Sequence, residues 1–152
     1  MISQELDKVQ RAIITIHREL FDESLSPMKL QKLCYYAQGY TLASGEILFP
    51  EDFQAWQHGP VIHELYDKYR DYKWNQITDD DLGEPDRDVY EYLRDIVSAY
   101  GRYDGAALST MTHREKPWLE ARGNLDESSG SNALIPKESL TDYFISKLRA
   151  NG

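Results

Sequence analysis

One cysteine and four histidines are the side chains in this sequence that nucleophilic or metal chemistry would require. Cys34 would need a neighbouring histidine to act as a nucleophile. It stands in an apolar stretch with Leu30 and Leu33, where a buried and inert thiol is the usual role. His58 and His63 are five residues apart across a Gly-Pro pair, which is not the i, i+4 spacing of a helical zinc pair. We therefore predict no catalytic residue and no metal ligand.

Nucleotide and acid–base chemistry lack their usual motifs as well. Gly101 and Gly105 stand alone, and no glycine run is followed by Lys-Ser or Lys-Thr, which excludes a phosphate-binding loop of that kind. Carboxylates are concentrated between Asp79 and Glu91, where no apolar wall would separate their pKa values. The sequence thus predicts a protein that is not an enzyme and needs no cofactor.

The charge balance bears on the class of partner. The chain carries 17 basic and 26 acidic residues, a net charge of −9. Seven of the acidic residues fall between Asp79 and Glu91, against Arg87 alone. This field repels phosphate backbones, so we expect no nucleic-acid partner. The segment itself has two interpretations: a solvated loop leading into a helix, or a docking surface for a basic partner.

Length and cysteine usage limit the organisation of the chain. Its 152 residues fit a single domain spanning 1–152. A lone cysteine cannot form a disulfide within the chain, which fits a reducing compartment. No run approaches the roughly 18 apolar residues of a membrane span, and the N-terminus lacks the features of a signal peptide. We expect a cytoplasmic protein without a membrane partner.

Eleven tyrosines and three tryptophans are the remaining chemical feature of the sequence. A buried tyrosine needs a partner for its hydroxyl, so we expect most to be core residues and several to lie at the surface, where aromatic rings favour protein interfaces. We predict binding by aromatic anchors, assisted by acidic residues. The predicted partner-binding residues are Tyr36, Tyr66, Tyr69, Tyr72, Trp74, Asp79, Asp80 and Asp81.

These side chains must be positioned by a mostly helical chain. Apolar residues at alternating three- and four-residue steps predict a helix over about 3–20. Ser26-Pro27 is a strong helix start, and apolar residues on nearly every side of 27–43 predict a central buried helix. Gly39 within it would let a neighbouring backbone approach closely.

The rest of the chain predicts one hairpin and further short helices. Residues 47–49 and 53–56 are typical of two short strands joined by a turn at Pro50. Gly59-Pro60 predicts the start of a helix to about Tyr72, and Asp86 and Asp104 predict caps of two more helices. A turn after residue 117 and a last helix containing 140–148 follow. The predicted fold is mainly α (α+β): a compact helical domain around a central buried helix, with one small β-hairpin.

Three blocks of residues, in order, resemble a known family: Ser26–Tyr40 (SPMKLQKLCYYAQGY), Ala55–Tyr66 (AWQHGPVIHELY) and Leu108–Arg122 (LSTMTHREKPWLEAR). Ile135-Pro136 and Tyr143-Phe144 complete the pattern. The chain resembles the Panacea domain, the SocA/GepA-like family, over about 26–144. It departs from the family at Cys34, where an aliphatic residue is more common, and at His63, where proline is frequent.

The resemblance implies an antitoxin of a phage-associated toxin–antitoxin system. Such a protein neutralises a cognate protein toxin by direct binding, without catalysis, and the acidic segment favours a toxin with a basic surface. One alternative is an adaptor that delivers a bound partner to a protease. A DNA-binding regulator is a weaker alternative because it would need a basic recognition helix, and no predicted helix is net basic by more than one or two charges.

Overall fold

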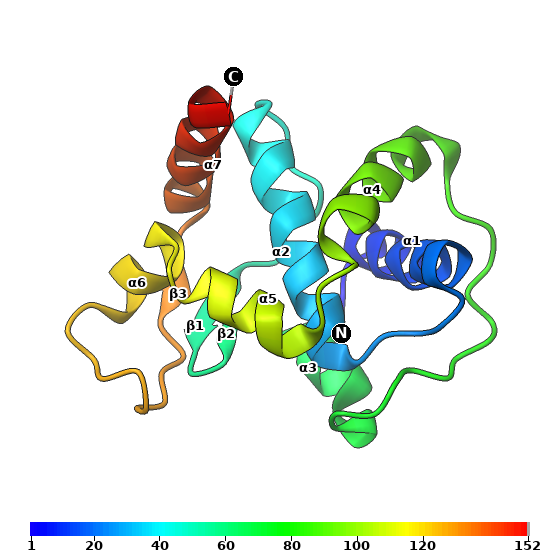
Figure 1. Cartoon of the computed structure of the whole chain (residues 1–152), viewed down its shortest axis with the longest axis horizontal. Helices are drawn as coiled ribbons and strands as arrows, with labels where there is room; N and C mark the ends of the chain where they lie inside the picture. Colours follow the sequence, from blue (N-terminus) through cyan, green and yellow to red (C-terminus); the bar gives the residue numbers. More distant parts are fainter. Residues whose placement is uncertain (152) are drawn as a thin grey trace.

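A computed structural model describes residues 1–151 of the chain (Figure 1). Within these residues the helices are α1 (Gln4–Phe21), α2 (Pro27–Ala43), α3 (His63–Tyr69), α4 (Arg87–Tyr100), α5 (Gly105–Thr112), α6 (Lys116–Arg122) and α7 (Lys137–Asn151), with a 3-10 turn, η1 (Arg70–Tyr72), after α3. Three short strands, β1 (Phe53–Trp56), β2 (Gly59–Val61) and β3 (Leu134–Ile135), form one antiparallel sheet in the order β2-β1-β3. The prediction of a mainly α protein with a small β element is confirmed.

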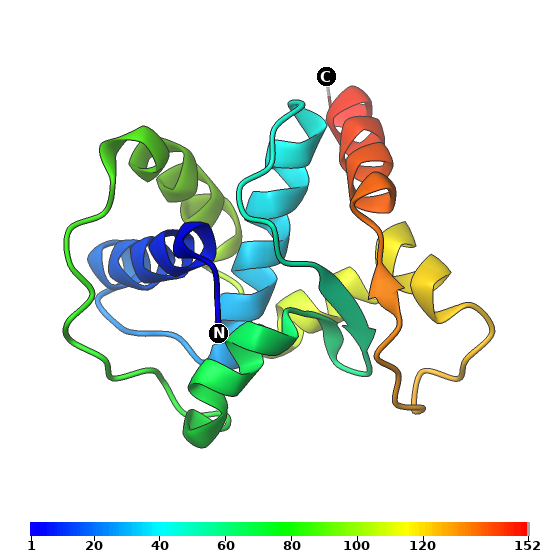
Figure 2. The same cartoon turned by 180° about the vertical axis from the view of Figure 1, so that it is seen from behind.

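Helix α2 forms the centre of the fold, and its bounds match the prediction. The hydroxyl of Ser26 accepts a hydrogen bond from the backbone N–H of Lys29 at 3.2 Å, and Pro27 occupies the first helical position. α1 and α4 lie on one side of α2 and α7 lies on the other (Figures 1 and 2). Gly39 faces α7 so closely that an added Cβ would lie 2.2 Å from the ring of Phe144. The absence of a side chain at Gly39 therefore allows the two helices to pack.

A buried carboxylate joins α2, α6 and α7. Glu115, which precedes α6, accepts hydrogen bonds from the hydroxyls of Tyr35 and Tyr36 at 2.8 and 2.9 Å. The Nζ of Lys147 on α7 lies 3.8 Å from the same carboxylate. Burial raises the pKa of Glu115, while Lys147 and the tyrosine hydroxyls oppose that rise. This network holds α7 against α2.

The observed hairpin is shifted along the chain from the predicted one. Residues 47–49 form no strand, because the side chain of Gln38 satisfies their backbone: its Nε2 donates to Phe49 O at 2.7 Å and its Oε1 accepts from Leu48 N at 2.9 Å. β1 pairs instead with β2, with Ala55 opposite Pro60, and with β3. Gly59-Pro60 therefore begins a strand and not a helix, and proline is tolerated there because β2 is an edge strand.

The segment between η1 and α4 runs along the outer side of α1 (Figures 1 and 2). Arg18 donates to Ile77 O at 2.9 Å, and Arg11 donates to Asp81 O at 2.7 Å. Asp86 precedes α4 as predicted, but its carboxylate makes no capping bond and pairs with Lys8 at 2.6 Å. The helix predicted to begin at residues 59–60 begins at residue 63 and reaches residue 72 only through the 3-10 turn.

Within residues 1–151, no helix combines the length and the apolar character that crossing a bilayer would demand.

Candidate partner-binding site

A hollow of about 480 Å³ lies where the start of α2, the β1–β2 turn, α3 with η1 and the start of α5 meet. We call it the aromatic groove, after the large side chains that line it. Its exposed large apolar members are Trp74 (81% exposed), Tyr66 (40%) and Met28 (36%), and the half-buried Trp56 lies beside them. Large apolar side chains gathered at the surface are typical of a site that binds another protein.

Local structure explains how these rings reach the surface. The 3-10 turn ends at Tyr72 and is followed by Lys73, which has a φ of +55°, an uncommon conformation for a residue with a side chain. Trp74 follows Lys73 directly and so lies beyond the end of the packed helix. The ring of Trp56 contacts that of Tyr66 edge-on, with centroids 4.9 Å apart, and its Nε1 donates to Gln54 at 2.8 Å. The Trp56 and Tyr66 walls are therefore held in place before any partner binds.

The charged side chains that line the aromatic groove are basic. Lys32 of α2 is only 1% exposed, and its Nζ donates to Pro60 O at 3.1 Å. Burial lowers the pKa of Lys32 to about 7. Arg70 and Lys73 are exposed at the same groove, and His58 adds an exposed imidazole ring. No aspartate or glutamate is among the described residues that line it.

The five predicted aromatic anchors divide between surface and core. Tyr66 and Trp74 lie at the aromatic groove. Tyr69 lines its inner wall but is 2% exposed, with its hydroxyl donating to Gln10 at 2.6 Å. Tyr36 is fully buried and bonded to Glu115, so neither of these two rings is available to a partner in this conformation. Tyr72 is half-buried, and its hydroxyl donates to Asp79, outside the groove.

The three predicted aspartates lie on the other side of α3. Asp79 is half-buried and accepts a hydrogen bond from the hydroxyl of Tyr72 at 2.6 Å. Asp80 and Asp81 are exposed, and the three residues line a smaller hollow with Arg11 and Lys68. Tyr69 separates this acidic surface from the aromatic groove, because it lines both hollows.

Sequence reasoning missed Met28, Lys32, Trp56 and His58 as members of the groove. The first two lie on the central helix, where the surrounding apolar residues indicate only core packing. The other two belong to the hairpin whose position was wrong. Trp56 stands two residues before His58 beside a Gly-Pro pair, which is a signal of a tight turn but gives no indication of a binding site.

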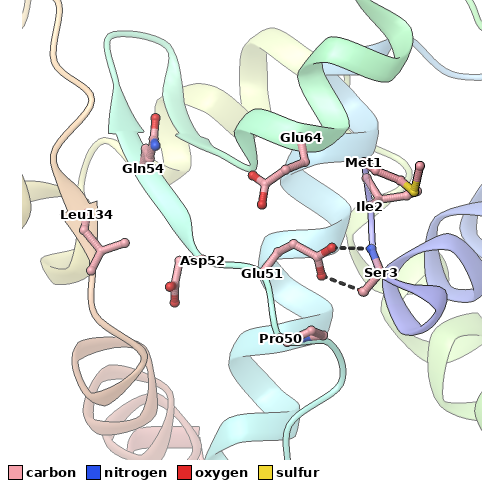
Figure 3. A pocket seen from close by; sticks show the side chains of 9 residues that line it. All are labelled: Met1, Ile2, Ser3, Pro50, Glu51, Asp52, Gln54, Glu64 and Leu134. Carbon is pink, nitrogen blue, oxygen red and sulfur yellow. Dashed lines mark hydrogen bonds between the residues drawn. The ribbon is translucent and has the colours of Figure 1, made fainter.

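A second hollow of about 570 Å³ lies between the N-terminus and the start of β1 (Figure 3). It contains three carboxylates, two of which bind within the chain. Glu51 accepts hydrogen bonds from the backbone N–H and the hydroxyl of Ser3 at 2.6 and 2.7 Å, as Figure 3 shows, and Asp52 pairs with Lys137 at 2.6 Å. Glu64 is half-buried. These contacts fasten the start of α1 and of α7, so the hollow serves the fold.

Cysteine and histidine side chains are the candidates for nucleophilic and metal chemistry. Cys34 lies in the core, and burial raises the pKa of its thiol, as expected for an inert side chain. The ring of His113 stacks on Trp118, with centroids 4.2 Å apart. Within residues 1–151, no group of three or more His, Cys, Asp or Glu side chains could hold a metal ion.

Comparison with known proteins gives one match. The model of the family described as antitoxin SocA-like, Panacea domain, matches residues 30–119, which is more than half of the chain. These residues include most of α2, the β1–β2 hairpin, α3 and α5, and therefore most of the aromatic groove. No curated protein and no solved structure matches the chain.

Proposed function

Because the chain belongs to the SocA-like antitoxins with a Panacea domain, we propose that it neutralises a cognate protein toxin by binding it directly. Membership of this family indicates a non-enzymatic role and a protein partner. The observation that carries the direct-binding proposal is the aromatic groove, where Trp74 and Tyr66 are exposed and the Tyr66 ring is held against Trp56. Exposed aromatic side chains of this kind supply most of the binding energy in protein interfaces.

The acidic surface has a different part in the proposed complex. Asp80 and Asp81 are exposed, and charges of this kind mainly raise the rate of association with an oppositely charged surface. We infer that the complex forms in the cytoplasm and that the toxin presents a basic region to this side of α3. The aromatic groove then provides the contacts that keep the complex together.

Co-expression with the product of the adjacent gene tests the proposal. We expect the neighbouring protein to arrest growth when expressed alone, to be harmless together with this chain, and to purify with it as a complex. The half-life of the neighbouring protein should be the same with and without this chain; a shorter half-life in its presence would indicate the adaptor. A neighbouring gene whose product does not arrest growth, or a rescue without a complex, would refute direct neutralisation.

A further inference from the structure

Lys32 is a buried cation whose burial is not compensated within the described part of the chain. An ammonium group has three donors, yet the hydrogen bond of Lys32 is a single one, to Pro60 O. Burial alone lowers the pKa of Lys32, with no acidic residue among residues 1–151 opposing it. A buried charge without a partner is costly for a fold. The positive charge of Lys32 therefore has no carboxylate partner among residues 1–151.

The end of the Lys32 side chain packs closely against β2 and α5. An added Cβ on Gly59 would lie 2.6 Å from Lys32 Cε and 2.8 Å from Thr112 Oγ1. Lys32 therefore fills a narrow gap between α2, β2 and α5, and its side chain is directed by these walls. Lys32 is also one of the residues that line the aromatic groove, so its buried side chain lies between the groove and the backbone of β2.

The rim of the groove has the same sign of charge. Arg70 and Lys73 are exposed there. The guanidinium of Arg70 lies 5.9 Å from the centroid of the Tyr66 ring and forms a long, exposed ion pair with Asp67 at 3.9 Å. The protein as a whole carries a net charge of −9. A basic, apolar hollow in an acidic protein is complementary to a ligand that carries one negative charge beside apolar groups.

We propose that the aromatic groove takes a segment of the partner protein in which an aspartate or glutamate stands next to an apolar side chain. The carboxylate is bound by Lys32, with Arg70 and Lys73 at the entrance, and the apolar side chain packs between Trp74, Tyr66 and Met28. This assignment rests on the proposed function, since it describes how a protein partner is recognised. The volume of about 480 Å³ lies within the range of about 300–1,000 Å³ typical of pockets that enclose small groups.

The competing occupants fit these features less well. A nucleic acid would bring a row of phosphates close to Asp80 and Asp81 across α3, and the net charge of the protein opposes it. A second copy of this chain would offer its own acidic segment, in which Leu82 is the apolar side chain nearest to the three aspartates. The test below therefore includes both.

The test uses a displayed library of short peptides and the purified full-length chain. The central residue of each peptide is Asp, Glu, Asn, Gln or Lys, and its neighbours are apolar or aromatic. We expect Asp and Glu to be enriched at least about tenfold over Asn, Gln and Lys. Lys32→Met, which keeps the length of the side chain and removes its charge, should abolish this preference. Lys116→Met, at an exposed lysine of α6, should retain it, and Trp74→Ala should weaken binding of all peptides.

Each other result overturns the assignment. The assignment is wrong if no peptide is enriched or if acids and amides bind equally. It is also wrong if folded Lys32→Met keeps the preference for Asp and Glu. Binding of a single-stranded oligonucleotide that is lost in both Lys32→Met and Trp74→Ala would assign the groove to nucleic acid. A dimer in sedimentation that Trp74→Ala dissociates would assign it to a second copy.

Neutralisation of the adjacent gene product tests the proposed function separately from peptide binding. If Lys32→Met neutralises the adjacent gene product as well as the parent does, the groove assignment fails while the antitoxin function stands. If the parent chain neutralises nothing, the antitoxin function fails whatever the peptides show.

Discussion

Replacing Lys32 by methionine should change how the stability of the free protein depends on pH. Burial lowers the pKa of Lys32 from 10.5 to about 7 in the folded state. The unfolded chain keeps this proton up to about pH 10.5, whereas the folded chain releases it near pH 7. The unfolded state therefore binds more protons above pH 7, so the stability that depends on Lys32 rises with pH and is lost as pH falls through about 7.

The size of this effect follows from the same shift. Each pH unit over which the two states differ by one full proton changes the free energy of unfolding by about 1.4 kcal/mol. Between pH 6 and pH 8 the folded lysine goes from mostly charged to mostly neutral, which amounts to about 1.4 kcal/mol in total. The free energy of unfolding of the parent, minus that of Lys32→Met, should rise by this amount over the interval. Methionine should stabilise the fold most at pH 6, because it removes a buried charge.

Urea unfolding followed by tryptophan fluorescence at pH 6, 7 and 8 measures this difference. Burial lowers the pKa of His17, which titrates alike in parent and variant and largely cancels in the comparison. Burial is also the main cause that lowers the pKa of His113, but the charge of Lys32 adds a smaller part, so the contribution of His113 cancels only partly. Lys116→Met is the matched control and should give a difference that does not vary with pH. Parallel stability curves for the parent and Lys32→Met would show that Lys32 is not held in an unfavourable environment, and the reasoning about the groove would lose its main support.

Three further outcomes are expected. Gly39→Leu should lower the free energy of unfolding by about 3 kcal/mol or more, because its side chain would meet the Phe144 ring. The control Gly130→Leu, at a position with no atom nearby, should leave the free energy of unfolding unchanged. Equal thermal midpoints for the two variants would contradict the packing of α2 on α7. Trp74→Ala should speed dissociation of the toxin at least about tenfold, as measured by surface plasmon resonance. Its free energy of unfolding, measured with urea, should stay within about 0.5 kcal/mol of the parent value. An unchanged dissociation rate would place the anchor elsewhere. Neutralising Asp79, Asp80 and Asp81 together should slow association and reduce its salt dependence with dissociation nearly constant, and association rates that match the parent's across a salt series would exclude the acidic surface from the interface.

The sequence predicts those parts of the fold that local chemistry decides. Ser26-Pro27 and the apolar residues that follow specify α2 to the residue. The hairpin was misplaced because a distant side chain decides it: the amide of Gln38 binds the backbone of residues 48 and 49 and replaces the strand pairing. No pattern within residues 47–49 reports such a contact.

The candidate site divides in the same way. The excess of aromatic residues indicated an interface, and Tyr66 and Trp74 are indeed exposed. Which tyrosines are buried depends on partners that lie far along the chain, since Tyr36 bonds a carboxylate 79 residues away and Tyr69 an amide 59 residues away. Lys32 was missed for a related reason: a lysine within a helix indicates a solvated charge unless the surrounding fold is known.

The packing of α7 on α2 affects how the protein is made. Helix α2 is synthesised well before α7, but the face around Gly39 and Tyr36 is covered only when Phe144 and Lys147 have been synthesised. At about 5–20 residues per second, the 94 residues from Ala43 to Lys137 take roughly 5–20 s to add. During that interval the nascent chain presents an uncovered aromatic surface to chaperones and to other nascent chains. A chain cut short before α7 would keep this aromatic surface uncovered, because Phe144 and Lys147 are the residues that cover it.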